Sequence, residues 1–261
     1  MKHRLRSKYV LDWDALLRSI ILLGFIILLI WLIKTEQLTL YINPKFSGLV
    51  EITAYFLIPM LAAHLLTIYR PAAPLYQPHS HGSRWSYLPF IVVLLLAFAL
   101  PDHILNANLV GTKGLNSQTA AASTTAAYEM PRPLADTLRQ APLIEVTDKD
   151  YTEIMDELQF FTQDYVDKEI TMTGFVFKPP GVTPKQFSLV RYVVVCCTAD
   201  ALPYGILCEL EDKAGYEEGE WLTVTGRIQQ VPYEDKMVPS IKLTSVKKVP
   251  EPKAPYVFPP S

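Results

Sequence analysis

Residues 16–33 read LLRSIILLGFIILLIWLI, and this apolar run is the stretch that decides the fold class. A helix needs roughly 20 apolar residues to cross the ~30 Å hydrocarbon core of a bilayer, so the run predicts a transmembrane span. A secretory signal peptide also begins with basic residues, but its apolar region is shorter and ends in small residues at a cleavage site. This run continues through Trp31 to Lys34, which favours a retained membrane anchor.

Two further apolar runs follow, over residues 49–69 and 85–100. Their Leu, Val, Ile and Phe residues show no polar stripe, which favours lipid surroundings over the interior of a soluble protein. We therefore expect a membrane region over residues 1–104 with three transmembrane helices. Cytoplasmic flanks are enriched in Lys and Arg, and the N-terminus is expected in the cytoplasm because it carries Lys2, Arg4, Arg6 and Lys8. Three crossings then place everything after residue 100 outside the cytoplasm.

The two halves of the chain differ in charge and in composition. Residues 1–140 contain twelve Lys or Arg and seven Asp or Glu, whereas residues 141–261 contain twelve against nineteen, together with all three cysteines. Nucleic-acid binding depends on Lys and Arg that neutralise phosphates, so the acidic half excludes a nucleic-acid partner. Residues 105–140 are rich in Ala, Ser, Thr and Asn without an apolar period, which predicts a flexible extracytoplasmic tether.

The remaining residues, 141–261, have the pattern of a small β-rich domain. Residues 143–146 resemble a short strand, and apolar residues at helical spacing predict a helix over 151–165 with Asp148 as its N-cap. Short strands are expected over five further segments, 170–177, 187–197, 204–210, 221–230 and 238–249. Five short strands favour a Greek-key barrel of the OB type. The expected fold class is thus a membrane α-helical region followed by a small OB-like β-barrel domain.

Several stretches of the chain resemble the YcgQ-like family of bacterial membrane proteins. The resemblance rests on five of them: YINPKF at 41–46, KEITMTGFVF at 168–177, VVVCCTADALP at 193–203, WLTVTGRI at 221–228 and KAPYVFP at 253–259. It implies a multi-pass protein of the bacterial cell membrane that works as an accessory subunit of a larger multi-span permease. The chain departs from the family pattern at Thr198, where alanine is usual, and in residues 78–82, which reduce a His-rich loop to Pro-His-Ser-His-Gly.

The cysteines carry the candidate chemistry of the β-rich domain. Cys196 and Cys197 are adjacent on an expected strand, which predicts that their side chains leave on opposite faces. Either one could pair with Cys208 in a disulfide, because an external compartment permits oxidation. Alternatively, thiolates and a carboxylate suit a divalent metal such as zinc, which gives Cys196, Cys197, Asp200 and Cys208 as candidate ligands. Inert packing is the third reading, because a buried cysteine usually behaves as a small hydrophobic residue.

Polar residues inside an expected span form a second candidate feature. Glu51 and His64 lie in the second apolar run, and ionisable groups within a membrane are costly and tend to be functional. They are hypothesised to face a partner's helices or a proton path, whereas the alternatives are an interfacial carboxylate and a hydrogen-bonded neutral imidazole. His79 and His81 stand in a polar loop and are interpreted as loop residues. No phosphate-binding loop or paired-histidine helix motif occurs, and an enzyme is disfavoured.

The sequence favours an accessory subunit of a membrane permease, whose external OB-like domain binds or senses a small solute or metal ion. Three helices are too few to enclose a transport pathway alone. Homo-oligomerisation could supply more helices, but a larger permease partner in the same bilayer is the simpler expectation. The rival reading is a stand-alone membrane-anchored protein that binds metal or performs thiol redox chemistry through its cysteines.

Overall fold

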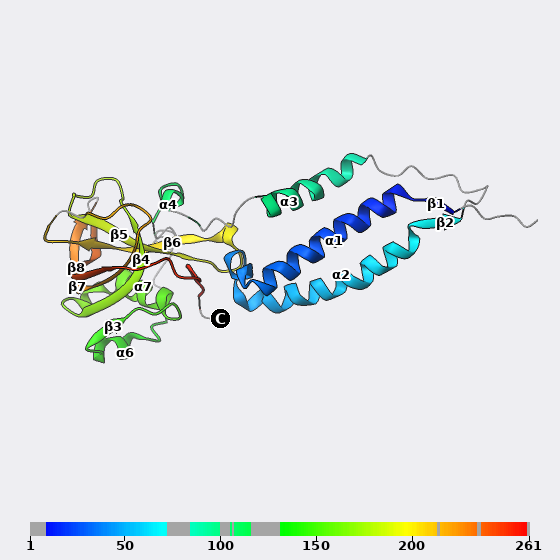
Figure 1. The fold of residues 1–261 in the computed structure, drawn as a ribbon. Coiled ribbons are helices and arrows are strands. Elements are labelled where there is room, and N and C mark those ends of the chain that lie inside the picture. The colour runs from blue at the N-terminus through cyan, green and yellow to red at the C-terminus, as the bar shows by residue number, and fades with distance from the viewer. Residues whose placement is uncertain are drawn as a thin grey trace, which may run out of the picture. The chain divides into compact units, whose positions relative to one another are not determined.

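The computed structural model describes residues 9–71, 84–99, 105, 107–115, 131–212, 215–233 and 236–259. The chain divides into two compact units (Figure 1). A helical unit comprises residues 1–39 and 44–103, and a sheet unit comprises residues 40–43 and 104–261. The short segment 40–43 thus belongs to the sheet unit, although it lies in the sequence between the first two long helices.

The helical unit is built from three apolar helices, α1 (Trp13–Lys34), α2 (Ser47–Thr67) and α3 (Leu88–Ala99). Shorter elements flank them, namely β1 (Tyr9–Leu11), η1 (Gln37–Leu40), η2 (Pro44–Phe46), β2 (Tyr69–Pro71) and η3 (Arg84–Tyr87). Helix α1 begins where the carboxylate of Asp12 accepts the backbone N–H groups of Asp14 and Ala15, at 3.0 and 3.1 Å. These bonds satisfy donors that have no partner in the first helical turn.

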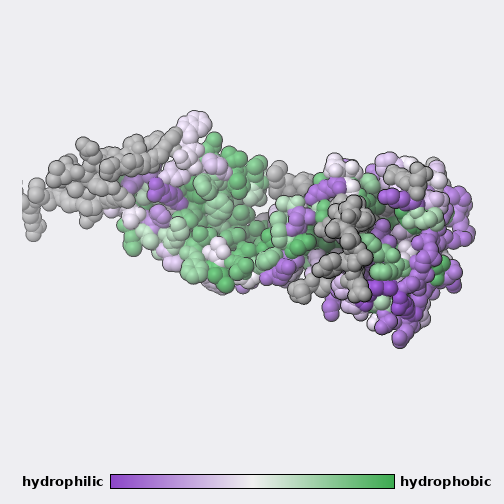
Figure 2. All heavy atoms as spheres, turned by 180° about the vertical axis from the view of Figure 1, so that it is seen from behind, coloured by the Kyte–Doolittle hydropathy of each residue, from purple (hydrophilic) through white to green (hydrophobic). Residues whose placement is uncertain are grey.

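Two of the described helical segments, Trp13–Lys34 and Pro44–Thr67, are long and apolar enough to cross a membrane. Helix α3 has 12 residues, about 18 Å of rise, which is shorter than the ~30 Å hydrocarbon core. The expected third span over 85–100 is therefore present as an apolar helix but is not long enough, within the described residues, to count as a span. Large apolar side chains are exposed along all three helices, and Figure 2 shows hydrophobic residues over the visible face of this unit.

The sheet unit contains the strands expected between residues 141 and 250. Its strands are β3 (Leu143–Glu145), β4 (Glu169–Phe177), β5 (Gln186–Val193), β6 (Leu202–Glu209), β7 (Trp221–Tyr233), β8 (Lys236–Lys248) and β9 (Tyr256–Val257). Its helical elements are α4 (Ala107–Lys113), α6 (Ala135–Gln140), α7 (Tyr151–Phe160), η4 (Thr162–Tyr165) and η5 (Thr198–Asp200). The expected strand over 187–197 ends earlier, at Val193, and this difference reshapes the cysteine region.

The strands form one mixed seven-stranded sheet in the order β3-β4-β7-β8-β6-β5-β9, and β4 also pairs with β5. The pairs β3–β4, β6–β8 and β5–β9 are parallel, and the other pairs are antiparallel. Helix α7 contacts β6 and β8, and its Ile154 and Leu158 are buried with residues of the sheet in one hydrophobic core. Burial of these side chains is the main stabilising contribution to the unit.

Both ends of the segment expected to be a flexible tether, 105–140, differ from that expectation. Helix α4 buries Ala107 and Val110 in a hydrophobic cluster with residues of β4, β5 and β7, and helix α6 buries Leu138 in the main core. Apolar residues in two short helices therefore hold these ends on the sheet unit, and the long-window pattern of the sequence is too coarse to reveal them. The central residues 116–130 lie outside the described part of the chain.

The start of α7 also differs from the sequence-based expectation. The residue that precedes the helix is Asp150, whose side chain makes no capping hydrogen bond. Asp148, the expected cap, instead accepts a hydrogen bond from the buried guanidinium of Arg191 at 2.8 Å. An unpaired buried guanidinium would cost more free energy than the loss of one helix cap, so Asp148 pairs with Arg191.

Candidate functional site

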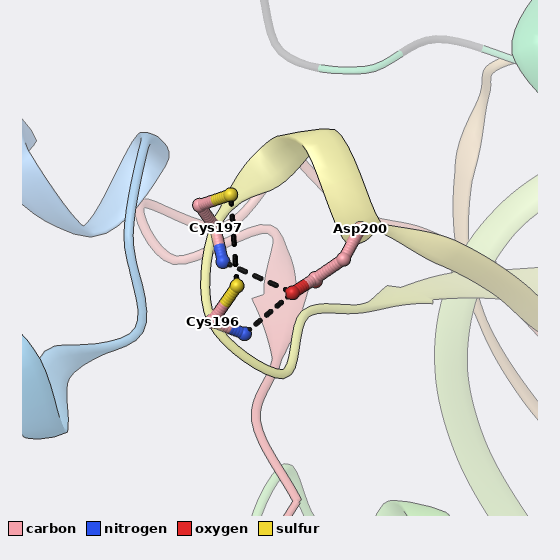
Figure 3. Close-up of side chains that lie close together, drawn as sticks. All are labelled: Cys196, Cys197 and Asp200. Carbon is pink, nitrogen blue, oxygen red and sulfur yellow. Dashed lines mark hydrogen bonds between the residues drawn. The ribbon is translucent and has the colours of Figure 1, made fainter.

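The candidate site lies in the connection between β5 and β6. The chain leaves β5 after Val193, bends at residues 195 and 196, and forms the short turn η5 before β6 begins. The carboxylate of Asp200 accepts the backbone N–H groups of Cys196 and Cys197 at 2.7 and 3.3 Å (Figure 3), and that of Val195 at 3.0 Å. One carboxylate therefore folds this connection into a compact loop, because it satisfies three backbone donors that no strand partner uses.

The fold of this loop brings both cysteine side chains to the same place. The Sγ atoms of Cys196 and Cys197 lie 3.7 Å apart, and the ligand atoms of Cys196, Cys197 and Asp200 all lie within 4.8 Å of one another. The expectation that the two cysteines point to opposite faces is wrong, because it assumed a continuous strand through both residues. The bend after Val193 removes the strict alternation of an extended chain.

Charge around the loop favours the protonated form of the Cys196 thiol. Burial alone would raise the pKa of Asp200, but hydrogen bonds from the Cys196 thiol and from the backbone N–H groups of Cys196, Val195 and Cys197 outweigh it and lower that pKa. The hydrogen bond to this carboxylate, followed by the bond to Cys197, raises the pKa of Cys196 to about 11. Three negative charges would meet here if both thiols ionised, so a bound cation would stabilise the ionised set.

Cys208, the fourth candidate ligand, does not belong to this cluster. It is fully buried in β6 opposite Phe187 of β5, and burial raises the pKa of its thiol to about 12. The pairing of Val193 with Leu202 closes the hairpin, and six further residues along β6 place Cys208 roughly 20 Å down the strand. All three cysteines are free thiols, and the structure does not bring Cys208 to either of the others.

A segment that the sequence did not single out as functional lies against the cysteine loop. We term Tyr41–Asn43 the clamp segment; it belongs to the sheet unit. Ile42 forms an antiparallel bridge with Cys197, the N–H of Asn43 donates to the carbonyl of Cys196 at 2.9 Å, and the N–H of Thr198 donates to the carbonyl of Tyr41 at 2.9 Å. Backbone bonds therefore tie this segment to both sides of the cysteine pair.

The side chain of Asn43 adds to this attachment. Its Nδ2 donates to the carbonyl of Val195 at 3.0 Å and to that of Val194 at 3.4 Å, and the residue is only 3% exposed. Buried amides are hydrogen-bonded as a rule. An Asn-Pro pair after an expected span is the sequence signal that could have pointed here, but nothing in it identifies a partner about 150 residues away.

The intramembrane candidates Glu51 and His64 both lie on α2, where Glu51 is exposed and His64 is half-buried. Their separation in sequence corresponds to about 20 Å along the helix axis and to nearly opposite faces at ~100° per residue. They do not form one polar seam. His79 and His81 lie outside the described residues.

Each half of the chain matches the model of a known protein domain. Residues 17–116 match the DUF1980 N-terminal domain, and residues 121–259 match the DUF1980 C-terminal domain. A Streptococcus mutans protein named "Putative two-component membrane permease complex subunit" is 24% identical over 93% of this chain and 99% of its own length. The Bacillus subtilis "UPF0703 protein YcgQ" is 23% identical over 92% of this chain and 98% of its own length. The resemblance to YcgQ-like proteins is confirmed.

Proposed function

The chain belongs to the DUF1980 family, and from this membership and the site geometry we propose that it is an accessory subunit of a bacterial membrane permease. In this proposal the sheet unit lies outside the cytoplasm and binds a thiophilic divalent metal ion such as zinc. The observation that carries the metal assignment is the convergence of Cys196, Cys197 and Asp200 within 4.8 Å. The name of the Streptococcus relative supports the permease assignment.

The spacing of the two sulfur atoms fits one shared ion. Two thiolates on a tetrahedral zinc ion, with Zn–S bonds of about 2.3 Å, lie about 3.8 Å apart. The Sγ atoms of Cys196 and Cys197 are 3.7 Å apart. The loop therefore holds both sulfurs close to the required separation, and little rearrangement is needed when a metal binds.

Asp200 can complete this ligand set. A carboxylate offers about four acceptor positions, and backbone N–H groups occupy three of them. The Cys196 thiol also donates to this carboxylate, and loss of that proton frees a position for the metal. Three protein ligands leave a fourth position for water or an incoming ligand, which suits a site that exchanges its ion more than a closed structural site.

The sheet pairings support the OB-like part of the proposal. Strand β4 pairs with both β7 and β5, so the series β4-β7-β8-β6-β5 returns to its first strand. An OB-like barrel is a five-stranded, partly open Greek key of this kind. We propose that the domain presents the cysteine loop from such a barrel.

The membrane region supports a partner in the bilayer. Large apolar side chains are exposed on all three helices, as expected for surfaces covered by lipid or by another protein's helices. Three helices are too few to surround a polar pathway, so we propose a larger multi-span permease as the partner. The multi-pass topology, with three crossings and a cytoplasmic N-terminus, belongs to the same proposal, as does the absence of a catalytic role.

The short distance between the two sulfurs also suits one alternative. This is a stand-alone membrane-anchored protein that uses its cysteines for metal binding or thiol redox chemistry. A redox thiol reacts as the thiolate, whereas the Asp200 carboxylate raises the pKa of Cys196 to about 11. The charge of the loop therefore favours metal binding over thiol exchange.

Mild-detergent purification of the tagged full-length protein from its native membranes tests the proposal. Mass spectrometry of co-purifying chains and a metal assay are applied to the same sample. Recovery of a multi-span permease in comparable amount, with metal that disappears in a Cys196→Ser variant, supports both parts. Recovery of the chain alone, under conditions that keep other membrane complexes intact, overturns the accessory-subunit role in favour of the stand-alone alternative.

A further inference from the structure

The clamp segment Tyr41–Asn43 is joined to two membrane helices by chain on both sides. Helix α1 ends at Lys34 and helix α2 begins at Ser47, so the segment lies in the middle of their connection. The flanking residues form the short helical turns η1 and η2, and Pro44 directly follows Asn43. The connection from Thr35 to Phe46 contains no glycine. Helical turns and a proline restrict the backbone, so a shift of the clamp segment is poorly absorbed within the connection.

The other side of the clamp segment contacts the candidate ligands through their own backbone. The carbonyl of Cys196 accepts the N–H of Asn43, and the carbonyl of Tyr41 accepts the N–H of Thr198, both at 2.9 Å. These two bonds pair Ile42 with Cys197, so a shift of either cysteine changes them first. The buried Asn43 amide would lose its bond to Val195 if the loop moved away, and an unsatisfied buried donor is costly.

We propose that the clamp segment couples metal occupancy of the Cys196–Cys197–Asp200 site to helices α1 and α2. The inference rests on the proposed metal binding and adds its regulatory consequence. When a divalent ion binds, two thiol protons leave and the Cys196 Sγ–H bond to Asp200 is replaced by bonds to the ion. The cysteine backbone adjusts, and the clamp segment transfers the adjustment to the first turn of α2 and the last turn of α1. Helices α1 and α2 thereby respond to whether the metal site of the sheet unit is occupied.

Hydrogen–deuterium exchange on the full-length protein in detergent or nanodiscs tests this coupling, with Zn²⁺ alone as the probe. The readout is the first turn of α2, whose amides have no partner within the helix and exchange measurably. Zn²⁺ is expected to change their exchange rate by about fivefold or more in the wild type, the lower end of typical coupling between sites. Asn43→Ala removes the side-chain bonds to Val194 and Val195 but keeps the backbone bonds of the clamp segment. It is therefore expected to reduce this response at saturating Zn²⁺, and Asn108→Ala on the exposed face of α4 is the matched control.

The outcomes separate the inference from the function on which it rests. Zn²⁺ binding by the wild type with unchanged exchange in α2 overturns the coupling and leaves the metal site intact. A wild type that binds no Zn²⁺ overturns the metal site and the coupling with it. A response in folded Asn43→Ala that is as large as in the wild type overturns the role of the clamp segment. The first two comparisons use only the wild type, so they decide even if Asn43→Ala does not fold.

Discussion

The carboxylate of Asp200 accepts the backbone N–H of Cys196 at 2.7 Å, while the thiol of the same cysteine also donates to it. One side chain thus shapes the loop and sets the charge that its cysteines experience. The backbone bonds shape the loop that carries both sulfurs, and the negative charge favours the protonated form of the Cys196 thiol. Both effects depend on a carboxylate, because conversion to an amide removes the negative charge and one of the two acceptor oxygens.

Asp200→Asn is expected to weaken Zn²⁺ binding by about tenfold to a hundredfold. Both oxygens of Asp200 accept backbone N–H groups, whereas an amide offers one acceptor, and a hydrogen bond to a charged group contributes about 1.5–3 kcal/mol. Competition with a chromogenic zinc chelator measures the change. Asp212→Asn, at an exposed position, serves as the control with equal loss of charge. Wild-type affinity in Asp200→Asn would remove this carboxylate from the site.

The alkylation of Cys196 is expected to rise steeply only as the pH approaches about 11, the pKa set by its hydrogen bond to Asp200. The thiolate is the reactive form, so alkylation by a neutral reagent at neutral pH should be slow. Asp200→Asn removes the negative charge, lowers this pKa and speeds alkylation at pH 8. Peptide mapping by mass spectrometry across a pH series gives the profile, with buried Cys208 as an internal unreactive reference. A wild-type profile that is already complete near pH 8 contradicts the assignment.

Gly174→Ala is expected to destabilise the sheet unit by about 1–3 kcal/mol, as overpacked substitutions do. A Cβ atom at this position would lie 2.7 Å from the carbonyl oxygen of Val190, next to the pairing of β4 with β5. The urea midpoint of the detergent-solubilised full chain reports the change. Gly111→Ala has open space around its Cβ and should be neutral or slightly stabilising in its helix. Equal midpoints for the two variants would argue against close approach of β4 and β5.

Asp156→Asn is expected to stabilise the protein by about 1 kcal/mol at neutral pH, once solvent screening of this half-buried group is allowed for. Burial, and then the charge of Glu153, raises the pKa of Asp156 to about 6, above the ~3.9 of an unfolded chain. Stability from the protonated form is therefore fully present below about pH 4 and is lost as the pH rises through about 6. The variant's advantage should vanish near pH 4 in urea titrations. Asp136→Asn, with a side chain 92% exposed, serves as the exposed control with equal loss of charge.

Much of the fold follows from local sequence pattern. The apolar runs at 16–33 and 49–69 correspond to α1 and α2, and the expected strands correspond to β4 through β8. These patterns are local because apolar runs and strand alternation are properties of neighbouring residues. The third run, 85–100, corresponds to the 12-residue helix α3, because composition alone does not determine where a short apolar helix begins and ends.

The candidate site could be predicted only in part. The residue types around Cys196 pointed to metal chemistry, and the loop does bring Cys196, Cys197 and Asp200 together. The exclusion of Cys208 depends on hairpin register, which a few residues at the turn decide. The clamp segment depends on contacts across about 150 residues of sequence, and no local pattern in a single chain encodes such a contact.

Cobalt(II) titration of the purified full-length protein tests the metal site most directly, because thiolate ligands give Co²⁺ a near-ultraviolet charge-transfer band that Zn²⁺ displaces. The account predicts one ion for each chain and a weaker charge-transfer band in Cys196→Ser and in Cys197→Ser. The band is retained in Cys208→Ala, which loses only about 1 kcal/mol of folding stability. A band that depends on Cys208, or wild-type protein that forms no thiolate–cobalt band, would contradict it.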